Sequence, residues 1–176
     1  MKINPNIQIH PLTIEREGAV GSLIRRNLES FNEHETVLVA MFRRLRNLHE
    51  IYLQEGCQFL VGMDIAKPDK PIACVGLGPF HGLPLSEGVG EIRDLVVEES
   101  YRGQGIGKML LERSLEAAKK FGYSRLYLET SRSMLVAQKL FESRGFRPVT
   151  GKNPLLTTSR DQDGSDVPCY YLLENL

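Results

Sequence analysis

A short glycine-rich segment lies between an apolar run and a helical pattern, and its residue types suit anion binding. The segment is Arg102-Gly103-Gln104-Gly105-Ile106-Gly107-Lys108. A strand that leads through glycines into a helix leaves several backbone N–H groups unpaired at one place, where the helix dipole also favours negative charge. Such a place binds a phosphate or pyrophosphate group. Glycine is favoured because a Cβ atom would hold the anion away from the backbone.

Two common phosphate-binding motifs do not fit this segment. A Walker A loop requires a glycine where Arg102 stands. A dinucleotide-binding G-x-G-x-x-G motif counted from Gly103 ends at Lys108 instead of glycine. A third pattern, Arg/Gln-x-x-Gly-x-Gly/Ala, fits Arg102, Gly105 and Gly107, and it resembles the pyrophosphate loop of the GNAT superfamily of acyl-CoA N-acyltransferases. The alternative is a turn that is rich in glycine for structural reasons alone.

The order of the downstream elements also resembles this superfamily. GNAT chains carry a motif strand, the loop and a long helix, followed by a strand, a second helix and a Gly-Phe pair. The corresponding segments here are 91–97, 102–107, 106–121, 125–130, 134–143 and 145–146. The resemblance covers 91–146 and implies an α/β fold of the α+β three-layer kind. Its centre is expected to be a mixed, mostly antiparallel sheet of about seven strands, flanked by about four helices.

The resemblance further implies a site for acetyl-CoA. In GNAT folds the motif strand diverges from its parallel neighbour, and the pantetheine arm pairs with the strand backbone in that gap. This places pantetheine at the backbone of Leu95, Val96 and Val97, where an N–H group would also polarise the thioester carbonyl. Core packing is the alternative role for this strand, and an ordinary surface position is the alternative for Arg102. The pyrophosphate is expected at Arg102, Gly103, Gln104, Gly105, Ile106, Gly107 and Lys108.

Acetylation of an amine requires a group that removes a proton. A lysine-like amine has a pKa of about 10.4, so its neutral form costs roughly 4–5 kcal/mol at pH 7, which a general base helps to offset. By the resemblance Glu91 is this base, because histone-acetylating and other GNAT members place a glutamate at this point of the strand. An exposed carboxylate, or one paired with Arg93, is the alternative. Asp94 is the weaker candidate, because strand alternation directs it to the other face unless a bulge intervenes.

Two positions depart from the usual GNAT pattern in the second helix. Met134 replaces an asparagine that contacts CoA, and Phe141 replaces a tyrosine that protonates the leaving thiolate. Phe141 keeps a ring that can pack on CoA but has no proton to donate. A thiolate is a tolerable leaving group without an acid, because the pKa of a thiol is about 8.5. Three tyrosines are substitute acids, although packing within strands is the favoured role of each: Tyr127, Tyr170 and Tyr171.

The composition excludes several other classes of protein. The 176 residues are expected to form one domain, 1–176. Lys and Arg number 22 and Asp and Glu number 22, and this balance argues against a general nucleic-acid or anionic-membrane binder. The first residues lack the apolar run of a signal peptide, and no stretch is long and apolar enough to span a membrane, which predicts a cytoplasmic protein. The histidines lack metal-ligand spacing, so no metal is expected. Monomer and homodimer both stay open.

Hydrophobic periodicity predicts the remaining elements. Helices are expected over 14–31 and 35–55, and 78–90 is expected to be a loop. Arg43, Arg44 and Arg46 are expected on a solvated face of the second helix. The chain is expected to close with two strands separated by a long polar segment, 151–168. The expected strands are 7–11, 58–64, 72–77, 146–150 and 169–173.

These features together predict an N-acetyltransferase that moves an acetyl group from acetyl-CoA to a primary amine. A small-molecule amine acceptor is expected, with direct attack in a ternary complex. A protein lysine or N-terminal amine is the alternative acceptor. A weakly catalytic acyl-CoA-binding sensor is an alternative from a different class. Phe141 suggests this alternative, because it stands where GNAT enzymes usually carry the tyrosine that protonates the leaving thiolate.

Overall fold

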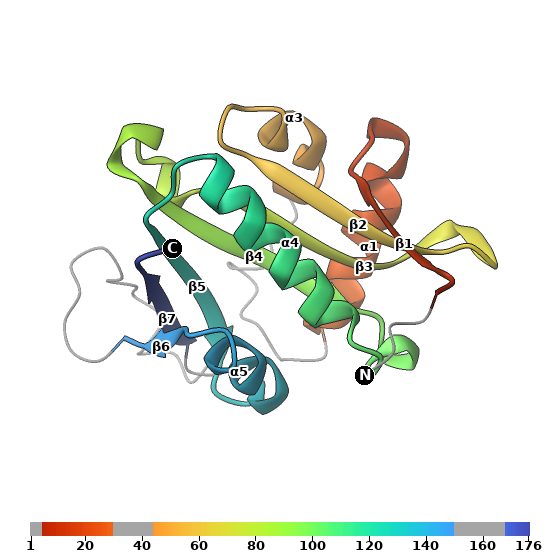
Figure 1. Ribbon diagram of the computed structural model, residues 1–176. Coiled ribbons are helices and arrows are strands. Elements are labelled where there is room, and N and C mark those ends of the chain that lie inside the picture. The colour runs from red at the N-terminus through yellow and green to blue at the C-terminus, as the bar shows by residue number, and fades with distance from the viewer. Residues whose placement is uncertain (1–4, 30–43, 150–167) are drawn as a thin grey trace.

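The computed structural model describes residues 5–29, 44–149 and 168–176. A seven-stranded sheet forms its centre, with helices on both faces (Figure 1). The strands are β1 (Ile7–Pro11), β2 (Gln58–Asp64), β3 (Lys67–Pro79), β4 (Val89–Val97), β5 (Arg125–Ser131), β6 (Arg147–Pro148) and β7 (Pro168–Glu174). The helices that lie within the described ranges are α1 (Glu17–Glu29), α3 (Leu48–Tyr52), α4 (Ile106–Lys120) and α5 (Leu135–Glu142).

The sheet is mixed and mostly antiparallel. Its strand order is β1-β2-β3-β4-β5-β7-β6. β4 and β5 run parallel, and every other pair of neighbours is antiparallel. The helix α4 connects the two parallel strands, as a parallel pair requires. The predicted fold class is therefore confirmed, whereas the single domain over 1–176 stays a prediction.

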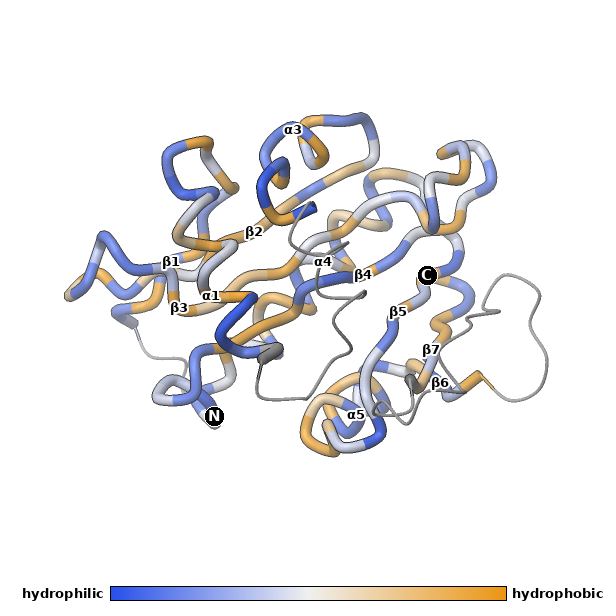
Figure 2. The backbone as a smooth tube through the Cα atoms, turned by 180° about the vertical axis from the view of Figure 1, so that it is seen from behind, coloured by the Kyte–Doolittle hydropathy of each residue, from blue (hydrophilic) through white to orange (hydrophobic). Residues whose placement is uncertain are grey.

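Alternate residues of the central strands serve two large apolar cores, one on each face of the sheet, and a smaller cluster of Phe80, Val89 and Tyr127. Figure 2 shows hydrophobic residues concentrated along β2 and β3, which are covered from both sides. One core lies under α4 and α5, and its fully buried members include Val75, Leu77, Leu110, Leu111, Leu126 and Leu128. The other lies under α1 and α3 and includes Val20, Leu23, Ile24, Leu48, Val61 and Cys74.

The helix α4 forms because its apolar residues recur at helical spacing on the face that meets the sheet. Its buried residues are Ile106, Leu110, Leu111, Ser114, Ala117 and Ala118. Lys119 and Lys120 occupy the last turn, where the dipole favours cations. Gly122, with a φ of +83°, follows the helix and turns the chain toward β5. This rigid element fixes the position of the glycine-rich segment at its start.

The predicted helix over 35–55 is wrong in its described part. Residues 44 and 45 are helical, but a turn at 46–47 separates them from the five-residue helix α3. Asn47 precedes α3 with φ −133° and ψ 26°, which is not a helical conformation. The apolar spacing continues through this break, so periodicity alone does not detect it. Residues 35–43 lie outside the described residues.

Other boundaries differ from the predictions by a few residues. α1 is preceded by a 3₁₀ turn, Ile14–Arg16, and β3 begins five residues earlier than expected, at Lys67. The segment predicted as a loop over 78–90 holds two 3₁₀ turns, and β4 already begins at Val89. The strand predicted over 146–150 is reduced to β6, and 151–167 lie outside the described residues. Within the described ranges, no helix has both the length and the apolar character to cross a membrane.

Candidate active site

The two parallel strands of the sheet are hydrogen-bonded over only the first half of β4. Val89–Ile92 pairs with Arg125–Leu128 of β5. Beyond this point β4 stays with β3, while β5 stays with β7 as far as Ser131. The strands therefore diverge, and Figure 1 shows β4 leading to the start of α4 while β5 leads toward α5. The β4 backbone over 93–97, which includes Leu95, Val96 and Val97, has no β5 partner along this edge.

A bulge interrupts β4 where the two strands separate. Asp94 and Leu95 stand together opposite a single residue of β3, and Asp94 has a φ of +52°. Aspartate tolerates this left-handed conformation better than most residues. This bulge is the exception that the sequence left open for Asp94: it brings the Asp94 side chain to the face covered by α1 and α3, where it meets Arg44. The bulge also gives β4 a sharper local bend at the divergence.

The glycine-rich segment forms a turn whose backbone opens toward the N-terminus of α4. Gly103 and Gly105 have φ values of +76° and +80°, which side chains with a Cβ rarely adopt. Gly105 occupies the N-cap position of α4, and within the described structure no side chain makes a capping hydrogen bond there. The first hydrogen bond of α4 runs from the Met109 N–H to the Gly105 carbonyl, 3.0 Å away. The preceding N–H groups, of Ile106, Gly107 and Lys108, are thus the donors that a helix N-terminus leaves for an anion.

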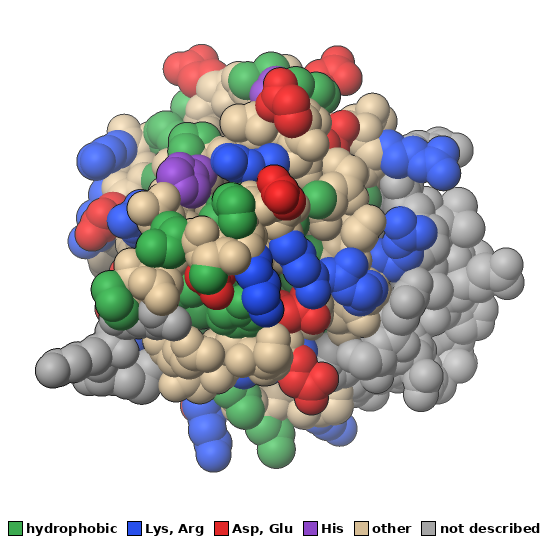
Figure 3. Space-filling view, turned by 90° about the vertical axis from the view of Figure 1, so that its right-hand side faces the viewer, with side chains coloured by type: hydrophobic (Ala, Val, Ile, Leu, Met, Phe, Trp, Pro, Cys, Tyr) green, Lys and Arg blue, Asp and Glu red, His purple; other side chains and the backbone are tan. Residues whose placement is uncertain are grey.

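Arg102 ties this turn to two other elements. Its Nε donates to the carbonyl of Val97 at 3.0 Å, and its Nη2 donates to Oδ1 of Asn27 on α1 at 2.8 Å. The guanidinium is exposed despite these contacts. Arg102 therefore does more than cover the surface: it fixes the end of β4 relative to the turn. The end of the molecule near the start of α4 carries several Lys and Arg side chains (Figure 3), and exposed Arg102 and Lys108 belong to the loop itself.

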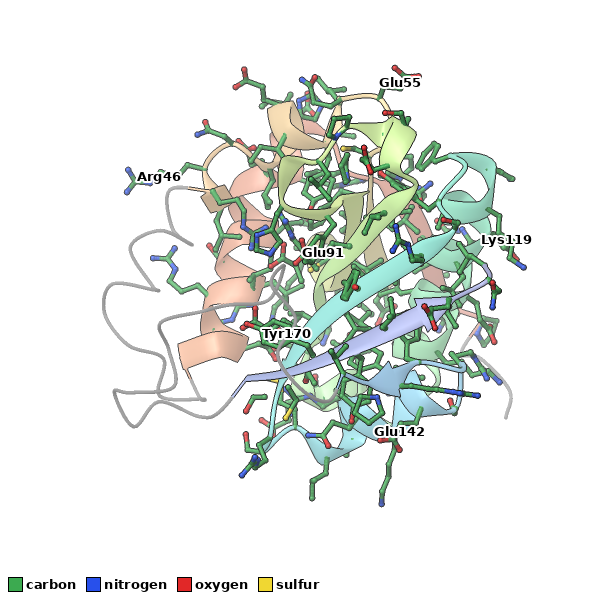
Figure 4. All side chains as sticks on the ribbon, turned by 90° about the vertical axis from the view of Figure 1, so that its left-hand side faces the viewer. Arg46, Glu55, Glu91, Lys119, Glu142 and Tyr170 are labelled. Atoms are coloured by element: carbon green, nitrogen blue, oxygen red, sulfur yellow. The ribbon has the colours of Figure 1, made fainter. Side chains whose placement is uncertain are left out.

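Glu91 is buried at the point where β4 and β5 separate. It pairs across the strands with Tyr127, and only 11% of its side chain is exposed. Arg93, two residues along the same face of β4, donates a hydrogen bond from Nη2 to Oε2 of Glu91. Figure 4 shows Glu91 near the middle of the sheet, well inside the molecule. The pairing with Arg93 that the sequence left open is present, and the second oxygen, Oε1, receives no hydrogen bond from the described residues.

A second ion pair lies beside the first. Arg44, which precedes α3, donates from Nη1 to Oδ2 of Asp94 and from Nη2 to Oδ1 at 2.7 Å. The side chain of Asp94 is 6% exposed and that of Arg44 is 24% exposed. Arg44 therefore does not lie on a solvated helix face as predicted, whereas Arg46 is exposed and projects from the surface (Figure 4). The two-point contact makes Arg44 and Asp94 a closed, mutually satisfied pair.

Burial and charge together set the protonation of this cluster. Burial opposes the charge of Arg93, but the hydrogen bond and the charge of Glu91 outweigh it and raise the pKa of Arg93. The same balance, with Asp94 as partner, raises the pKa of Arg44. Burial raises the pKa of Tyr52, and the charge of Asp94 raises it further, so its phenol stays protonated. The site thus holds two fixed cations, Arg44 and Arg93.

The residues considered for the leaving-group acid occupy different places. Phe141 is 5% exposed in the core under α4 and α5, and its ring centroid is 6.1 Å from that of Phe146 and 6.3 Å from that of Tyr171. Tyr171 donates its hydroxyl to Oε1 of Glu142 at 3.0 Å. Burial and this hydrogen bond raise the pKa of Tyr171, so it is poorly suited to act as an acid. Tyr127 and Tyr170 lie on the other face of the sheet, which is also the face of Glu91.

Sequence reasoning missed Arg44 and Tyr52 as members of the site. Arg44 is 50 residues from Asp94 in the chain, and its signal in the sequence was only an excess of arginines. Gly76 offered a clearer signal: a Cβ there would lie 2.3 Å from the hydroxyl of Tyr52, so glycine is needed for this tyrosine to reach the sheet.

In the described part of the chain, no group of three His, Cys, Asp or Glu side chains is arranged to hold a metal ion.

Comparison with known proteins places this geometry in a family. A family model described as the acetyltransferase (GNAT) family matches residues 24–146. The amino-acid acetyltransferase of Escherichia coli strain K12 is 34% identical over 142 residues, which are 81% of this chain and 27% of the relative. The chain thus spans about a quarter of the length of the curated relatives it matches.

Solved structures agree with this fold. A GNAT-family acetyltransferase from Staphylococcus aureus Mu50 superposes with a TM-score of 0.74 at 18% identity, covering 97% of this chain and 99% of the other. The acetyltransferase yncA of Salmonella typhimurium, solved with its cofactor acetyl-CoA, also gives 0.74, at 15% identity, with 97% and 95% covered. The chain belongs to the GNAT family of acetyltransferases. The family resemblance that the sequence predicted is therefore confirmed.

Proposed function

We propose that this protein transfers an acetyl group from acetyl-CoA to the primary amine of a small molecule, by direct attack in a ternary complex. The observation that carries the proposal is the position of Glu91, a buried carboxylate where β4 and β5 diverge. The name of the curated relatives, amino-acid acetyltransferase, supports a small-molecule acceptor.

The described residues suit acetyl-CoA at two places. The edge of β4 over Leu95, Val96 and Val97, which β5 does not pair, offers backbone groups to the pantetheine amides, apart from the Val97 carbonyl, which already accepts from Arg102. The turn over 103–108, with its two left-handed glycines and the N-terminus of α4, suits the pyrophosphate. We propose that Arg102 positions this turn through Val97 and adds positive charge, with Gln104 and Lys108 beside it.

In this proposal the acetyl-CoA thioester supplies the acyl group and CoA leaves as a thiolate. Glu91 removes a proton from the acceptor ammonium, through Oε1, directly or through a water molecule. A backbone N–H on the β4 edge donates to the thioester oxygen as negative charge develops there. The bond from nitrogen to the acetyl carbon forms while the carbon–sulfur bond breaks, and the second proton that the nitrogen loses passes to the departing thiolate or to solvent.

The order of substrate binding tests direct attack. We expect initial rates of CoA release, measured over a grid of acetyl-CoA and amine concentrations, to give intersecting double-reciprocal lines. Parallel lines, together with an acetylated protein detected by mass spectrometry, would contradict the ternary complex. The panel should pair small amines with peptides that offer a lysine or an N-terminal amine, because peptides as the better acceptors would contradict the small-molecule proposal.

A substitution at Phe141 tests whether leaving-group protonation limits the rate. Phe141→Tyr restores a phenol at the usual GNAT position, and a gain is bounded by the general-acid range, at most roughly 10²-fold in turnover. The substitution should also lower the free energy of unfolding, because the ring is 5% exposed in the core and an unpaired hydroxyl there costs about 1–3 kcal/mol. We expect a modest rise in single-turnover acetyl transfer, a lower melting temperature and little change in acetyl-CoA affinity. A slower transfer with fold and affinity intact would show that no acid is needed at this position.

A further inference from the structure

The bulge at Asp94 decides which side chains of β4 face α1 and α3. Arg93, before the bulge, lies on this face of the sheet. Val96, after the bulge, belongs to the core on the same face, whereas Leu95 and Val97 pack against the core under α4 and α5. In a regular strand the side chains alternate, so residues 93, 95 and 97 would share one face. The extra residue therefore lets the two halves of β4 serve opposite faces.

Asp94 occupies the bulge under two unfavourable conditions. Its φ of +52° is left-handed, a conformation that residues with a Cβ atom rarely adopt. Its carboxylate is buried, with 6% of the side chain exposed, and a buried charge is costly without a partner. An extended conformation would relieve the backbone strain, so the bulge needs contacts that hold this residue in place.

Two neighbours supply these contacts. Arg44, which precedes α3, donates to both carboxylate oxygens of Asp94, and the bond to Oδ1 is 2.7 Å long. The thiol of Cys74 on β3 donates to the carbonyl of Asp94 at 3.3 Å. Burial raises the pKa of Cys74, so the thiol keeps its proton. A thiol is a weak donor whereas a two-point charged contact is strong, so Arg44 is the main restraint on the bulge.

The bulge separates the two parts of β4 that the proposed reaction uses. Glu91, bonded by Arg93, lies before it along the strand, and the proposed cofactor edge over 95–97 lies after it. A change in the bulge would therefore move one part relative to the other. Their relative position matters, because the amine that Glu91 deprotonates has to meet the thioester carbon held at the cofactor edge.

We propose that Arg44 is a positioning residue for acetyl transfer: by holding Asp94 in its left-handed conformation, it maintains the bulge that aligns Glu91 with the cofactor edge. The guanidinium acts through the backbone of β4 and touches neither the acceptor nor the thioester. This inference rests on the proposed function and deepens it, since it names a further residue that the same reaction requires.

Two substitutions at Asp94 separate the backbone conformation from the carboxylate. Asp94→Gly and Asp94→Ala both remove the charge, but only glycine adopts a φ of +52° without strain. We expect Asp94→Gly to keep the single-turnover rate of acetyl transfer, measured with the best small amine, within about threefold of wild type. Asp94→Ala should lower this rate on the order of 10- to 100-fold. Acetyl-CoA affinity should change little in either variant, because the turn at 103–108 is untouched.

The same logic predicts a rescue. Arg44→Gln should lower the rate on the order of 10- to 100-fold, because the bulge loses its main restraint. Adding Asp94→Gly to this variant should restore the rate to within about threefold of wild type, since glycine needs no partner there. Arg46→Gln is the matched control, because it removes an exposed arginine two residues along the chain and should leave the rate unchanged. Where Arg44→Gln does not fold, the double variant and the two Asp94 variants carry the comparison.

Equal rates in Asp94→Gly and Asp94→Ala would overturn the inference, because the left-handed conformation would then not matter for transfer. A loss in Arg44→Gln that Asp94→Gly does not restore would also overturn it, and a raised KM for the amine would then indicate direct contact with the acceptor. A normal rate in Arg44→Gln with a lower melting temperature would leave Arg44 a purely structural role. No transfer by the wild-type protein to any amine would instead defeat the proposed function, and this inference with it.

Discussion

Replacement of Glu91 by glutamine is expected to lower turnover at pH 7 by a factor on the order of 10²–10⁴. Glutamine keeps the size of the side chain and an oxygen that can accept the Arg93 hydrogen bond, but it cannot take up a proton. Acetyl-CoA binding should be unchanged, because the proposed cofactor contacts lie further along β4 and in the turn at 103–108. Single-turnover measurements of acetyl transfer give the comparison, with acetyl-CoA affinity measured separately.

The deficit of this variant should shrink as the pH rises. An acceptor amine with a pKa of about 10.4 loses its proton to solvent at high pH, so the base becomes less necessary. Glu116→Gln is a suitable control, since it removes an exposed carboxylate from α4. Equal single-turnover rates for Glu91→Gln and wild type at pH 7, with chemistry rate-limiting, would show that another group or bulk water acts as the base.

Acetyl-CoA is expected to stabilise the wild-type fold strongly. At about 100 times its dissociation constant a ligand adds roughly 2.7 kcal/mol to the unfolding free energy. For a chain of this size this corresponds to a rise in melting temperature of about 5–10 °C. Gly105→Val should abolish the rise, because a side chain at this helix cap obstructs the proposed pyrophosphate position and disfavours the φ of +80°. Thermal unfolding with and without acetyl-CoA measures both effects.

The matched control for this variant is Gly122→Val. Gly122 has a similar φ, +83°, and lies at the opposite end of α4 with open space around the position of a Cβ. Both valine variants should unfold at lower temperatures than wild type, because valine disfavours left-handed backbone. Only Gly105→Val should lose the response to acetyl-CoA. A full response in Gly105→Val would contradict the proposed pyrophosphate site, and loss of the response in both would point to general damage.

Much of the fold was predictable because local patterns and long-range packing agree. The apolar alternation of Leu126 and Leu128 in β5 and the helical spacing of α4 persist in the structure, since both serve the core under α4 and α5. The loop at 102–108 could be found because glycine is needed wherever the backbone turns left-handed before a helix. The divergence of β4 and β5 was predicted from the family resemblance alone. The strand register agrees with this prediction, because the pairing of the two strands ends at Ile92 and Leu128.

The site itself was less predictable because distant residues decide it. Strand alternation alone directs Asp94 away from Glu91, but the bulge and the bond to Arg44 reverse this. No local pattern reveals an arginine 50 residues away as the partner of an aspartate. The break at Asn47 is similarly hidden, since apolar spacing continues across it. In the sequence, Arg93 was only an alternative partner for Glu91, whereas the structure pairs the two side chains where β4 and β5 separate.

One measurement tests the central proposal most directly. The purified protein is incubated with acetyl-CoA and each acceptor in turn, and both products, free CoA and the acetylated acceptor, are quantified by mass spectrometry. The proposal predicts equimolar CoA and N-acetylated product with at least one small primary amine, at a rate that the Glu91→Gln variant does not reach. CoA released without any acetylated acceptor, or bound acetyl-CoA that stays intact with every amine, would contradict acetyl transfer to small-molecule amines.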